Sequence, residues 1–279
     1  MENILDGRAS EFALYTCVKE CLITKIASSK FNENMWLREY HTQNSKRLVY
    51  VYHEEESVLL QDGFVPGQHL SQNFREQFLQ YICVLAAPEL KIHGEVVGEE
   101  ILLSVQMEEK YLPLQLTLQA IHQNLSFAVR KKYVPQVYDG IKESMILAYP
   151  LEEEGAQHLY LILKKMELLN EMEHYHLLYL LLSQESMEGT RVCIHLRKEC
   201  ERGNIRFQGS RWEKILSYKT NTKMKHKWDK YKKRQNVMSL EWENVIDGIN
   251  SFATPIWNSL IKDEIFFGDW MPQLQRFLD

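Results

Sequence analysis

Apolar residues recur at helical spacing near the start of the chain. The pattern runs from Ala9 to Lys30 and predicts one amphipathic helix with a single apolar face. Ser28 and Ser29 are expected to end this helix. Its apolar positions are Phe12, Leu14, Val18, Leu22, Ile23 and Ile26.

The next segments favour strands. Arg47–His53 is rich in β-branched and aromatic residues, and Pro113–Gln119 alternates apolar and polar residues as a half-buried strand does. Glu100–Gln106 resembles a further strand, which a turn around Glu108–Tyr111 would join to Pro113–Gln119. Between the first strand and the other two, Ser71–Leu85 has a helical pattern.

The pattern changes after Tyr149 and Pro150, where long helical stretches take over and continue toward Asp279. We therefore expect an α/β lobe at residues 1–148 and a helical lobe at residues 149–279. No Pro- or Ser-rich linker separates them, which favours two lobes that share an interface. The first expected helices of the second lobe are Leu151–Leu169, Met172–Leu182 and Arg191–Arg202.

Composition narrows the class of protein. The chain has 279 residues, 33 of them basic and 38 acidic, and a net charge of −5, which excludes a protein that coats nucleic acid through overall charge. The N-terminus lacks the pattern of a signal peptide, and there is no run of about 18 apolar residues for a membrane span. Its five cysteines form no CxxC pair, which argues against a disulfide framework or a structural zinc site. We expect a cytoplasmic protein.

Several short motifs follow one another in a fixed order between roughly residues 95 and 260. They are Leu112–Leu118, Tyr149–Glu152 with Ala156–Leu159, Glu171–Tyr179, Cys200–Asn204 and Lys227–Ile256. Together they resemble the AbiEii family of abortive-infection toxins, whose motifs read IPLQIDV, YPLE…AEKL, RMKDFYDLY, ERRGT and W-x-x-Y…F-x-x-P. Each motif alone is common, but their shared order and spacing are not.

The resemblance implies a fold and a chemistry. The fold is an α/β (α+β) nucleotidyltransferase-like mixed sheet with flanking helices, followed by a mainly helical lobe. Such enzymes transfer a nucleotide from a triphosphate, with two divalent ions that bridge the attacking and leaving oxygens. The family holds these ions with two aspartates one residue apart on a strand, beside a Gly-Gly or Gly-Ser turn, because magnesium prefers carboxylate oxygens.

This sequence departs from that chemistry. The strand matched to the aspartate pair is Ser45–Tyr50, the expected glycines fall near Arg38–Tyr40, and no acid occurs between Lys110 and Asp139. Losing all of these residues together indicates a pseudoenzyme that needs no cofactor or metal. The vestigial positions implied by the resemblance are Leu48, Tyr50, Thr117, His158, Glu171, Glu173 and His174.

Four weaker signals have ordinary structural interpretations. The acidic run Glu54–Glu56 is either a displaced metal site or a solvated loop. His174 and His176 would point to different faces of one helix, which argues against a zinc site with His158. A nucleophilic pair of Cys193 and His195 has no supporting acid. The aromatic residues between Phe252 and Leu278 suit either an interface or a core.

Residues 219–234 carry eight Lys or Arg residues and one acid, with aromatic residues between them. Cations beside aromatic rings suit the backbone and bases of RNA or DNA. The alternative is a solvated helix whose Trp228 and Tyr231 pack inward while its lysines extend into solvent. The candidate nucleic-acid-binding residues are Lys223, Lys225, Lys227, Trp228, Lys230, Tyr231, Lys232, Lys233 and Arg234.

The favoured interpretation is a catalytically inactive nucleotidyltransferase-like scaffold or binding protein. It would act in a bacterial or phage-related defence or toxin–antitoxin context, with a protein partner and with RNA or DNA bound through residues 219–234. One alternative is a nucleic-acid-binding component unrelated to the family. The other is an active nucleotidyltransferase toxin with relocated metal ligands drawn from Glu54, Glu55, Glu56, Glu95, Glu99, Glu100 and Glu152.

Overall fold

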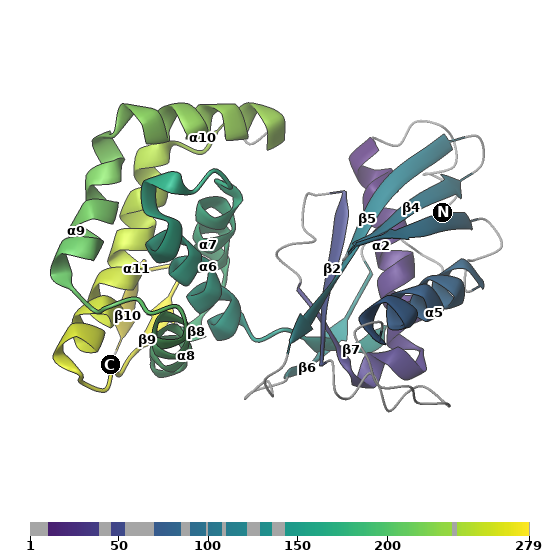
Figure 1. Cartoon of the computed structure of the whole chain (residues 1–279), viewed down its shortest axis with the longest axis horizontal. Helices are drawn as coiled ribbons and strands as arrows, with labels where there is room; N and C mark the ends of the chain where they lie inside the picture. Colours follow the sequence, from purple (N-terminus) through teal and green to yellow (C-terminus); the bar gives the residue numbers. More distant parts are fainter. Residues whose placement is uncertain are drawn as a thin grey trace. The chain divides into compact units, whose positions relative to one another are not determined.

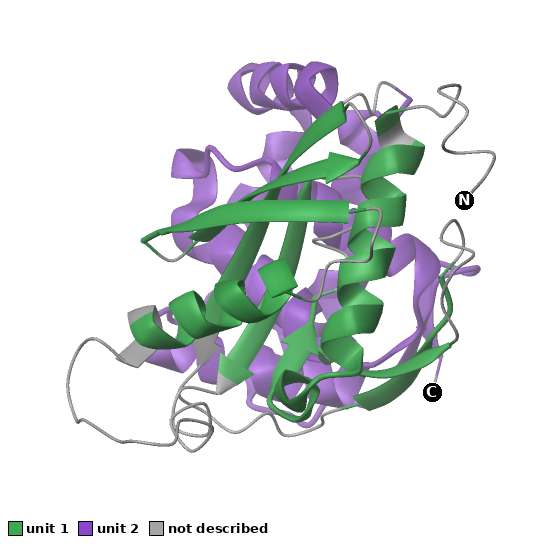
Figure 2. Ribbon diagram, turned by 90° about the vertical axis from the view of Figure 1, so that its right-hand side faces the viewer, with its two compact units in different colours: residues 1–150 green, residues 151–279 purple. Residues whose placement is uncertain are grey.

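The computed structural model describes residues 11–38, 46–53, 70–84, 90–98, 100–107, 110–121, 129–135, 143–235 and 239–278. The chain divides into two compact units, unit 1 at residues 1–150 and unit 2 at residues 151–279 (Figures 1 and 2). None of the helices within the described ranges is both long enough and apolar enough to cross a membrane.

Unit 1 is built around a seven-stranded mixed sheet with the strand order β3-β4-β5-β2-β1-β7-β6. The pairs β1–β7 and β2–β5 are parallel, and the other neighbours are antiparallel. The strands are β1 Met35–Leu37, β2 Arg47–His53, β3 Leu90–Val97, β4 Glu100–Met107, β5 Lys110–Ile121, β6 Val129–Tyr133 and β7 Ser144–Ala148.

Two helices, α2 (Glu11–Ala27) and α5 (Leu70–Val84), cover one face of this sheet, which we call the core face (Figure 2). Alternate residues of the strands point into the core beneath them, as the period of two requires. Phe31, in the short 3-10 helix η1 (Lys30–Glu33), packs edge-on against Phe78 of α5, with ring centroids 5.0 Å apart. This core holds the helices to the sheet.

The expected elements of unit 1 are largely confirmed. The first helix ends at Ala27, and the hydroxyl of Ser29 then accepts a hydrogen bond from the Phe31 amide at the start of η1. Strand β2 has the expected bounds, and α5, β4 and β5 lie where the patterns indicated. The sequence reading missed β1, β3, β6 and β7. Ser144–Ala148 is a strand, and the helix of the YPLE motif begins only at Leu151, after Pro150.

Unit 2 packs its helices around α11 (Trp242–Lys262), the longest of those described. The others are α6 Leu151–Lys165, η2 Met166–Leu168, α7 Glu173–Gln184, α8 Gly189–Arg202, α9 Gly209–Leu216, η3 Ser217–Thr220 and α10 Thr222–Gln235. Helix α6 has acids in its first turn and lysines in its last, which complements the helix dipole.

Two expectations for unit 2 are corrected. The helix expected at Leu151–Leu169 is α-helical only to Lys165, because Met166 adopts a positive φ of 49°. The helical pattern does not run to the end of the chain. A three-stranded sheet of order β10-β9-β8 closes the unit, with β8 Met187–Glu188, β9 Asp269–Met271 and β10 Arg276–Leu278.

An aromatic cluster forms part of the core of unit 2. The Trp228 side chain stacks on Tyr231, with ring centroids 5.4 Å apart, and lies 5.7 Å from the ring of Trp242. Tyr175 meets Trp242 edge-on at 5.0 Å. The Trp228 indole donates a hydrogen bond of 3.0 Å to the Leu240 carbonyl, so its one polar group is satisfied.

Candidate functional site

Strand β2 places Leu48 and Tyr50 on the core face. Leu48 is 0% exposed and Tyr50 is 2% exposed, and both belong to the hydrophobic core beneath α2 and α5. Burial raises the pKa of the Tyr50 hydroxyl, because a charge is unfavourable there. A carboxylate pair that holds hydrated magnesium cannot lie in this environment. Leu48 and Tyr50 are therefore core residues.

The face of the sheet turned away from α2 and α5, the opposite face, carries polar residues at its centre. On β2 the alternation brings Arg47, Val49 and Val51 to this face. The parallel neighbour β5 contributes Gln115, Thr117 and Gln119, which pair in register with those three residues. We call the polar residues here the opposite-face cluster, which comprises Trp36, Arg38, Arg47, Gln115, Thr117 and Gln119.

Two arginines of this cluster are held by glutamines of β5. Arg38 directly follows β1 and is 3% exposed. Its Nη1 donates a 2.9 Å hydrogen bond to Gln119 Oε1, and its guanidinium lies 5.1 Å from the ring centre of Tyr149. Arg47 is half-buried, and its Nε donates a 3.3 Å hydrogen bond to Gln115 Oε1. Both guanidinium groups are thus braced over β5.

Two further polar groups of the cluster are buried without a hydrogen-bond partner among the described residues. They are the indole nitrogen of Trp36, whose side chain is 7% exposed, and the hydroxyl oxygen of Thr117. A buried polar group without a partner costs about 1–3 kcal/mol, so such groups often mark the place of a ligand. Thr117 is the vestigial position that the structure places in this cluster, between Gln115 and Gln119.

The sequence reading did not single out Trp36, Arg38 or the two glutamines. Arg38 entered it only as the place where small glycines were expected. A usable signal was nevertheless present, because Gln115, Thr117 and Gln119 alternate with leucines and must share one face of a strand. The neighbours that meet them on β1 and β2 depend on strand order.

The vestigial positions of unit 2 take part in ordinary packing and surface contacts. Nδ1 of His158, on α6, lies 3.1 Å from Nδ1 of His174, on α7, so these two residues do meet. The Lys165 ammonium donates a 2.9 Å hydrogen bond to the Glu171 carboxylate, and this ion pair lowers the pKa of Glu171. Glu173 is half-buried at the start of α7. Within the described ranges these residues do not form a group that could hold a metal ion.

The weaker candidate sites separate in the structure. His176 contacts the Tyr231 hydroxyl at 2.8 Å while His174 contacts His158, as their spacing predicts. Burial raises the pKa of the Cys193 thiol, which makes it a poor nucleophile. Nε2 of His195 lies 3.6 Å from Glu153.

The alternative function, an active nucleotidyltransferase, requires acidic residues that bind a metal ion. Within the described ranges, no three His, Cys, Asp or Glu side chains group so that they could hold a metal ion. The acidic run 54–56 and residue 99 lie outside these ranges. Of the other proposed ligands, Glu95 and Glu100 lie on β3 and β4 of unit 1, whereas Glu152 belongs to unit 2, where it accepts the Glu188 amide at 3.3 Å.

Several residues of the basic helix α10 that were predicted to bind nucleic acid instead make contacts within unit 2. Trp228 is 0% exposed and Tyr231 5% exposed, so both rings are core residues and are not available to stack on bases. Lys232 is buried and lies 3.3 Å from Glu241, while Lys225 is paired with Glu243. Lys227 donates to the carbonyls of Glu167 and Leu169 at 2.8 and 3.0 Å.

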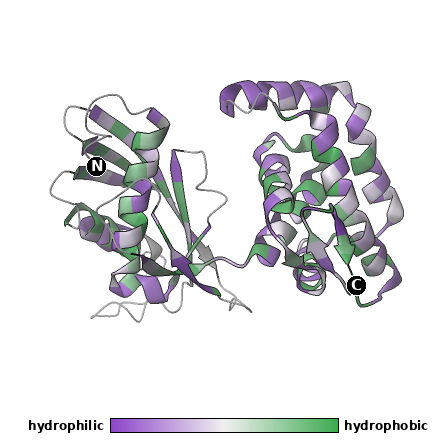
Figure 3. Ribbon diagram, turned by 180° about the vertical axis from the view of Figure 1, so that it is seen from behind, coloured by the Kyte–Doolittle hydropathy of each residue, from purple (hydrophilic) through white to green (hydrophobic). Residues whose placement is uncertain are grey.

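The remaining cations of α10 form one exposed row. Lys223, Lys230 and Lys233 are exposed, as are His226 and Arg234, and the helical spacing places all five on the face away from Trp228. We call these five residues the basic stripe. Figure 3 shows that α10 is predominantly hydrophilic. The three lysines have no ion pair within the described part of the chain.

The aromatic C-terminal segment is mostly core. Trp257 and Trp270 are each 1% exposed, and their indole groups donate to the carbonyls of Gln208 and Leu182 at 3.1 and 2.8 Å. Phe267, in contrast, is 69% exposed.

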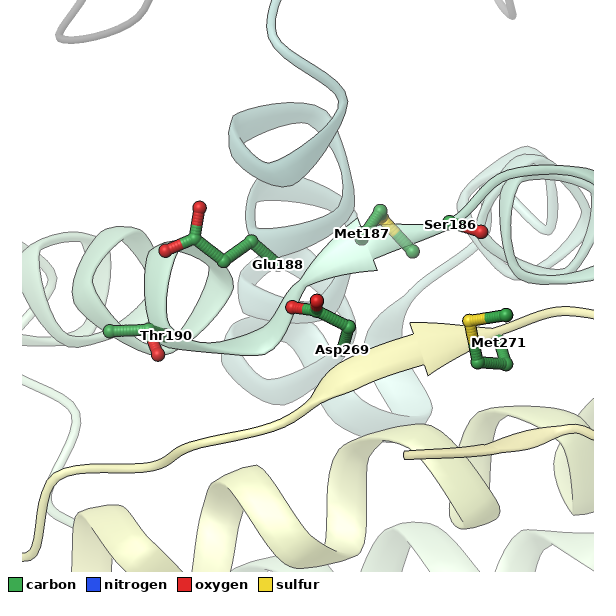
Figure 4. A pocket seen from close by; sticks show the side chains of 6 residues that line it. All are labelled: Ser186, Met187, Glu188, Thr190, Asp269 and Met271. Atoms are coloured by element: carbon green, nitrogen blue, oxygen red, sulfur yellow. The ribbon is translucent and has the colours of Figure 1, made fainter. Parts of the chain in front are cut away.

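A shallow pocket of unit 2 lies at the β8–β9 edge (Figure 4). Glu188 and Asp269 oppose each other across the two strands, and Met187 and Met271 supply apolar surface. The Glu188 carboxylate already pairs with Arg191 at 2.6 Å. The pocket contains no nucleophile with an adjacent base, so it offers no catalytic arrangement.

His176 provides a pH-dependent test of the unit 2 core. Burial lowers its pKa below 6.5, so the folded protein keeps this imidazole neutral where the unfolded chain takes up a proton. Stability is therefore present above pH 6.5 and is lost as the pH falls below it, by up to about 1.4 kcal/mol per pH unit from this group. Urea unfolding at pH 7.0, 6.0 and 5.0 should give a shallower decline for His176→Gln than for the wild type. Parallel declines would contradict this assignment.

Comparison with known proteins identifies the fold. No protein-family model and no curated protein matches the sequence. Among solved structures, the chain is similar to MenT4, a nucleotidyltransferase toxin from Mycobacterium tuberculosis, with a TM-score of 0.52 and 10% sequence identity. The match covers 94% of this chain and 97% of that chain. At this identity the likeness concerns the fold, and this chain therefore has a nucleotidyltransferase-like mixed α/β fold.

Proposed function

We propose that this chain is a catalytically inactive, nucleotidyltransferase-like binding protein. The observation that supports this most directly is the set of side chains on the opposite face at the centre of the sheet. Strands β2 and β5 present Arg47, Val49 and Thr117 there, a cation, an aliphatic side chain and a hydroxyl. None of them is a carboxylate, and the charge of Arg47 would repel a divalent cation. The vestigial positions of unit 2 add no pair of metal-binding carboxylates.

We further propose that the protein works through a partner protein of the antitoxin kind, in a bacterial or phage-related defence setting. The toxin identity of MenT4 supports this context, since the two chains share a fold over nearly their whole lengths. An inactive member of such a system would act by occupying a partner. Co-purification with the product of an adjacent gene, at a fixed stoichiometry, is the expected result.

A transfer assay tests the absence of catalysis. Purified protein is incubated with each of the four radiolabelled nucleoside triphosphates, magnesium or manganese, and total RNA or protein as acceptor. We expect no label above that of a heat-denatured control, because the central strands hold no ion-binding pair. Label transfer that is abolished by Glu54→Ala, Glu55→Ala or Glu56→Ala would instead establish the alternative with relocated metal ligands.

A second candidate function is nucleic-acid binding through the basic stripe. Its support is the row of exposed lysines on α10 whose charges are not neutralised by an acid of the described chain. In a protein with a net charge of −5, this row would orient the molecule toward a phosphate backbone. The buried rings of Trp228 and Tyr231 limit such binding to phosphate contacts, without base stacking.

Replacing Lys223, Lys230 and Lys233 together by glutamine should weaken RNA or DNA binding and make it less dependent on salt. The slope of log K against log salt should fall by about 2–3, since each phosphate contact contributes about 0.7–0.9. Fluorescence anisotropy at several salt concentrations measures both quantities. A matched pair of single variants provides the control: Lys230→Gln should weaken binding, whereas Lys225→Gln removes the same charge from a lysine already paired with Glu243. Equal effects of the two would refute the basic stripe.

A further inference from the structure

We infer that the opposite-face cluster binds a phosphate group directly, without a divalent metal ion. The inference deepens the proposed function and rests on it, because it names a ligand for the same face of the sheet. In the active enzymes divalent ions bridge the phosphate groups to the protein, whereas here two guanidinium groups would bind the phosphate directly.

The two arginines are close together because of the strand register. Leu37 pairs with Tyr50 across the antiparallel strands β1 and β2, and the Arg38 amide donates to the Val49 carbonyl at 2.9 Å. Arg38 therefore lies beside Val49 and diagonally from Arg47, at a Cα separation of about 7–8 Å. Two guanidinium groups on one face of a sheet can both donate to the same anion.

The glutamines of β5 fix where the guanidinium groups lie. Gln119 accepts from Arg38 and Gln115 accepts from Arg47, and the two glutamines lie two residues to either side of Thr117. The two hydrogen-bonded guanidinium groups thus lie to either side of Thr117 along β5. Holding both side chains in advance lowers the entropy lost when a ligand binds.

Two unpartnered donors lie on the same face. The Thr117 hydroxyl is between the two braces, and the Trp36 indole nitrogen is two residues before Arg38 on the same strand face. Both groups are buried, and the Trp36 side chain is only 7% exposed. A phosphate has enough acceptor oxygens for two guanidinium groups, a hydroxyl and an indole N–H at once. A carboxylate, with two oxygens, cannot serve all four donors as well.

Isothermal titration calorimetry of the full chain in EDTA tests this inference, with pyrophosphate and ATP as separate probes. We expect metal-free binding that is weakened at least tenfold by Arg47→Gln and by Thr117→Val. Arg47 is half-buried at the start of its strand, and valine nearly matches threonine in shape, so both variants should fold. Arg38→Gln should abolish binding where it folds. Lys91→Gln removes a cation from an exposed position of β3 and serves as the control, with unchanged affinity.

The outcomes are distinct. Binding of both probes with the expected losses supports a site that recognises phosphate itself, and binding of ATP alone with the same losses assigns the phosphate to a nucleotide. Binding that requires magnesium, binding unaffected by Arg47→Gln and Thr117→Val, or no binding of either probe would overturn the inference. Label transfer by the same preparations with magnesium would refute inactivity, and it would leave metal-free phosphate binding untouched.

Discussion

Replacing Leu48 by aspartate is expected to unfold unit 1. The Leu48 side chain is 0% exposed in the apolar core between the sheet and the helices α2 and α5, where a carboxylate would lose its hydration. The variant loses the leucine contacts and buries either a charge or a protonated acid, which together cost at least about 4 kcal/mol. Loss of cooperative urea unfolding, or a midpoint far below that of the wild type, measures the effect.

Arg47→Asp is the matched control, because it introduces the same carboxylate one residue earlier on the same strand. Arg47 is half-buried on the opposite face, so the new side chain can reach solvent, and we expect a loss of about 1 kcal/mol from the Gln115 contact. A Leu48→Asp protein as stable as Arg47→Asp would mean that β2 presents Leu48 and Tyr50 away from the core. That result would support the interpretation of these two positions as a former metal site.

Replacing Trp228 by alanine should cost about 3–5 kcal/mol of unit 2 stability. The side chain is 0% exposed, stacks on Tyr231 of the same helix and contacts the ring of Trp242 of α11. Its removal leaves a large cavity and also the Leu240 carbonyl without its indole donor. Chemical unfolding followed by circular dichroism measures the loss, since tryptophan fluorescence would change with the substitution itself.

Lys230→Ala, two residues along the same helix, should leave stability within about 0.5 kcal/mol of the wild type because its side chain is exposed. The two variants thus separate the structural and binding roles of α10. If Trp228→Ala folded normally and lost nucleic-acid affinity, Trp228 would be a binding residue and not a core residue. That result would contradict the packing described above.

Most elements of unit 1 were predictable from local pattern. The Arg47–His53 strand follows from its β-branched and aromatic residues and the Pro113–Gln119 strand from side-chain alternation, and both signals act over a few residues. The short strand β1 has only three residues, all buried, and offers no alternation to detect. Strand β6, with the sequence VRKKY, is polar because it lies at a sheet edge, where charged side chains are common.

The candidate sites were only partly predictable. The cations of α10 are visible in the sequence, but their division into paired and exposed lysines depends on Glu241, Glu243 and the carbonyls of residues 167 and 169. Those partners are distant in the chain or lie beyond the helix. Similarly, the sequence shows that Leu48 and Tyr50 share one face with each other, but not which face is covered by helices.

The sequence by itself determined the class of elements, the absence of acids from β5, and the concentration of positive charge at residues 219–234. These properties depend on residue type and local spacing alone. Only the tertiary structure decided that Leu48 and Tyr50 face the core and that Arg38 and Arg47 lie on the same face of the sheet as Thr117. The physical reason is that strand pairing joins residues as far apart as Arg38 and Gln119, and helix packing on one face of the sheet selects which alternate residues are buried.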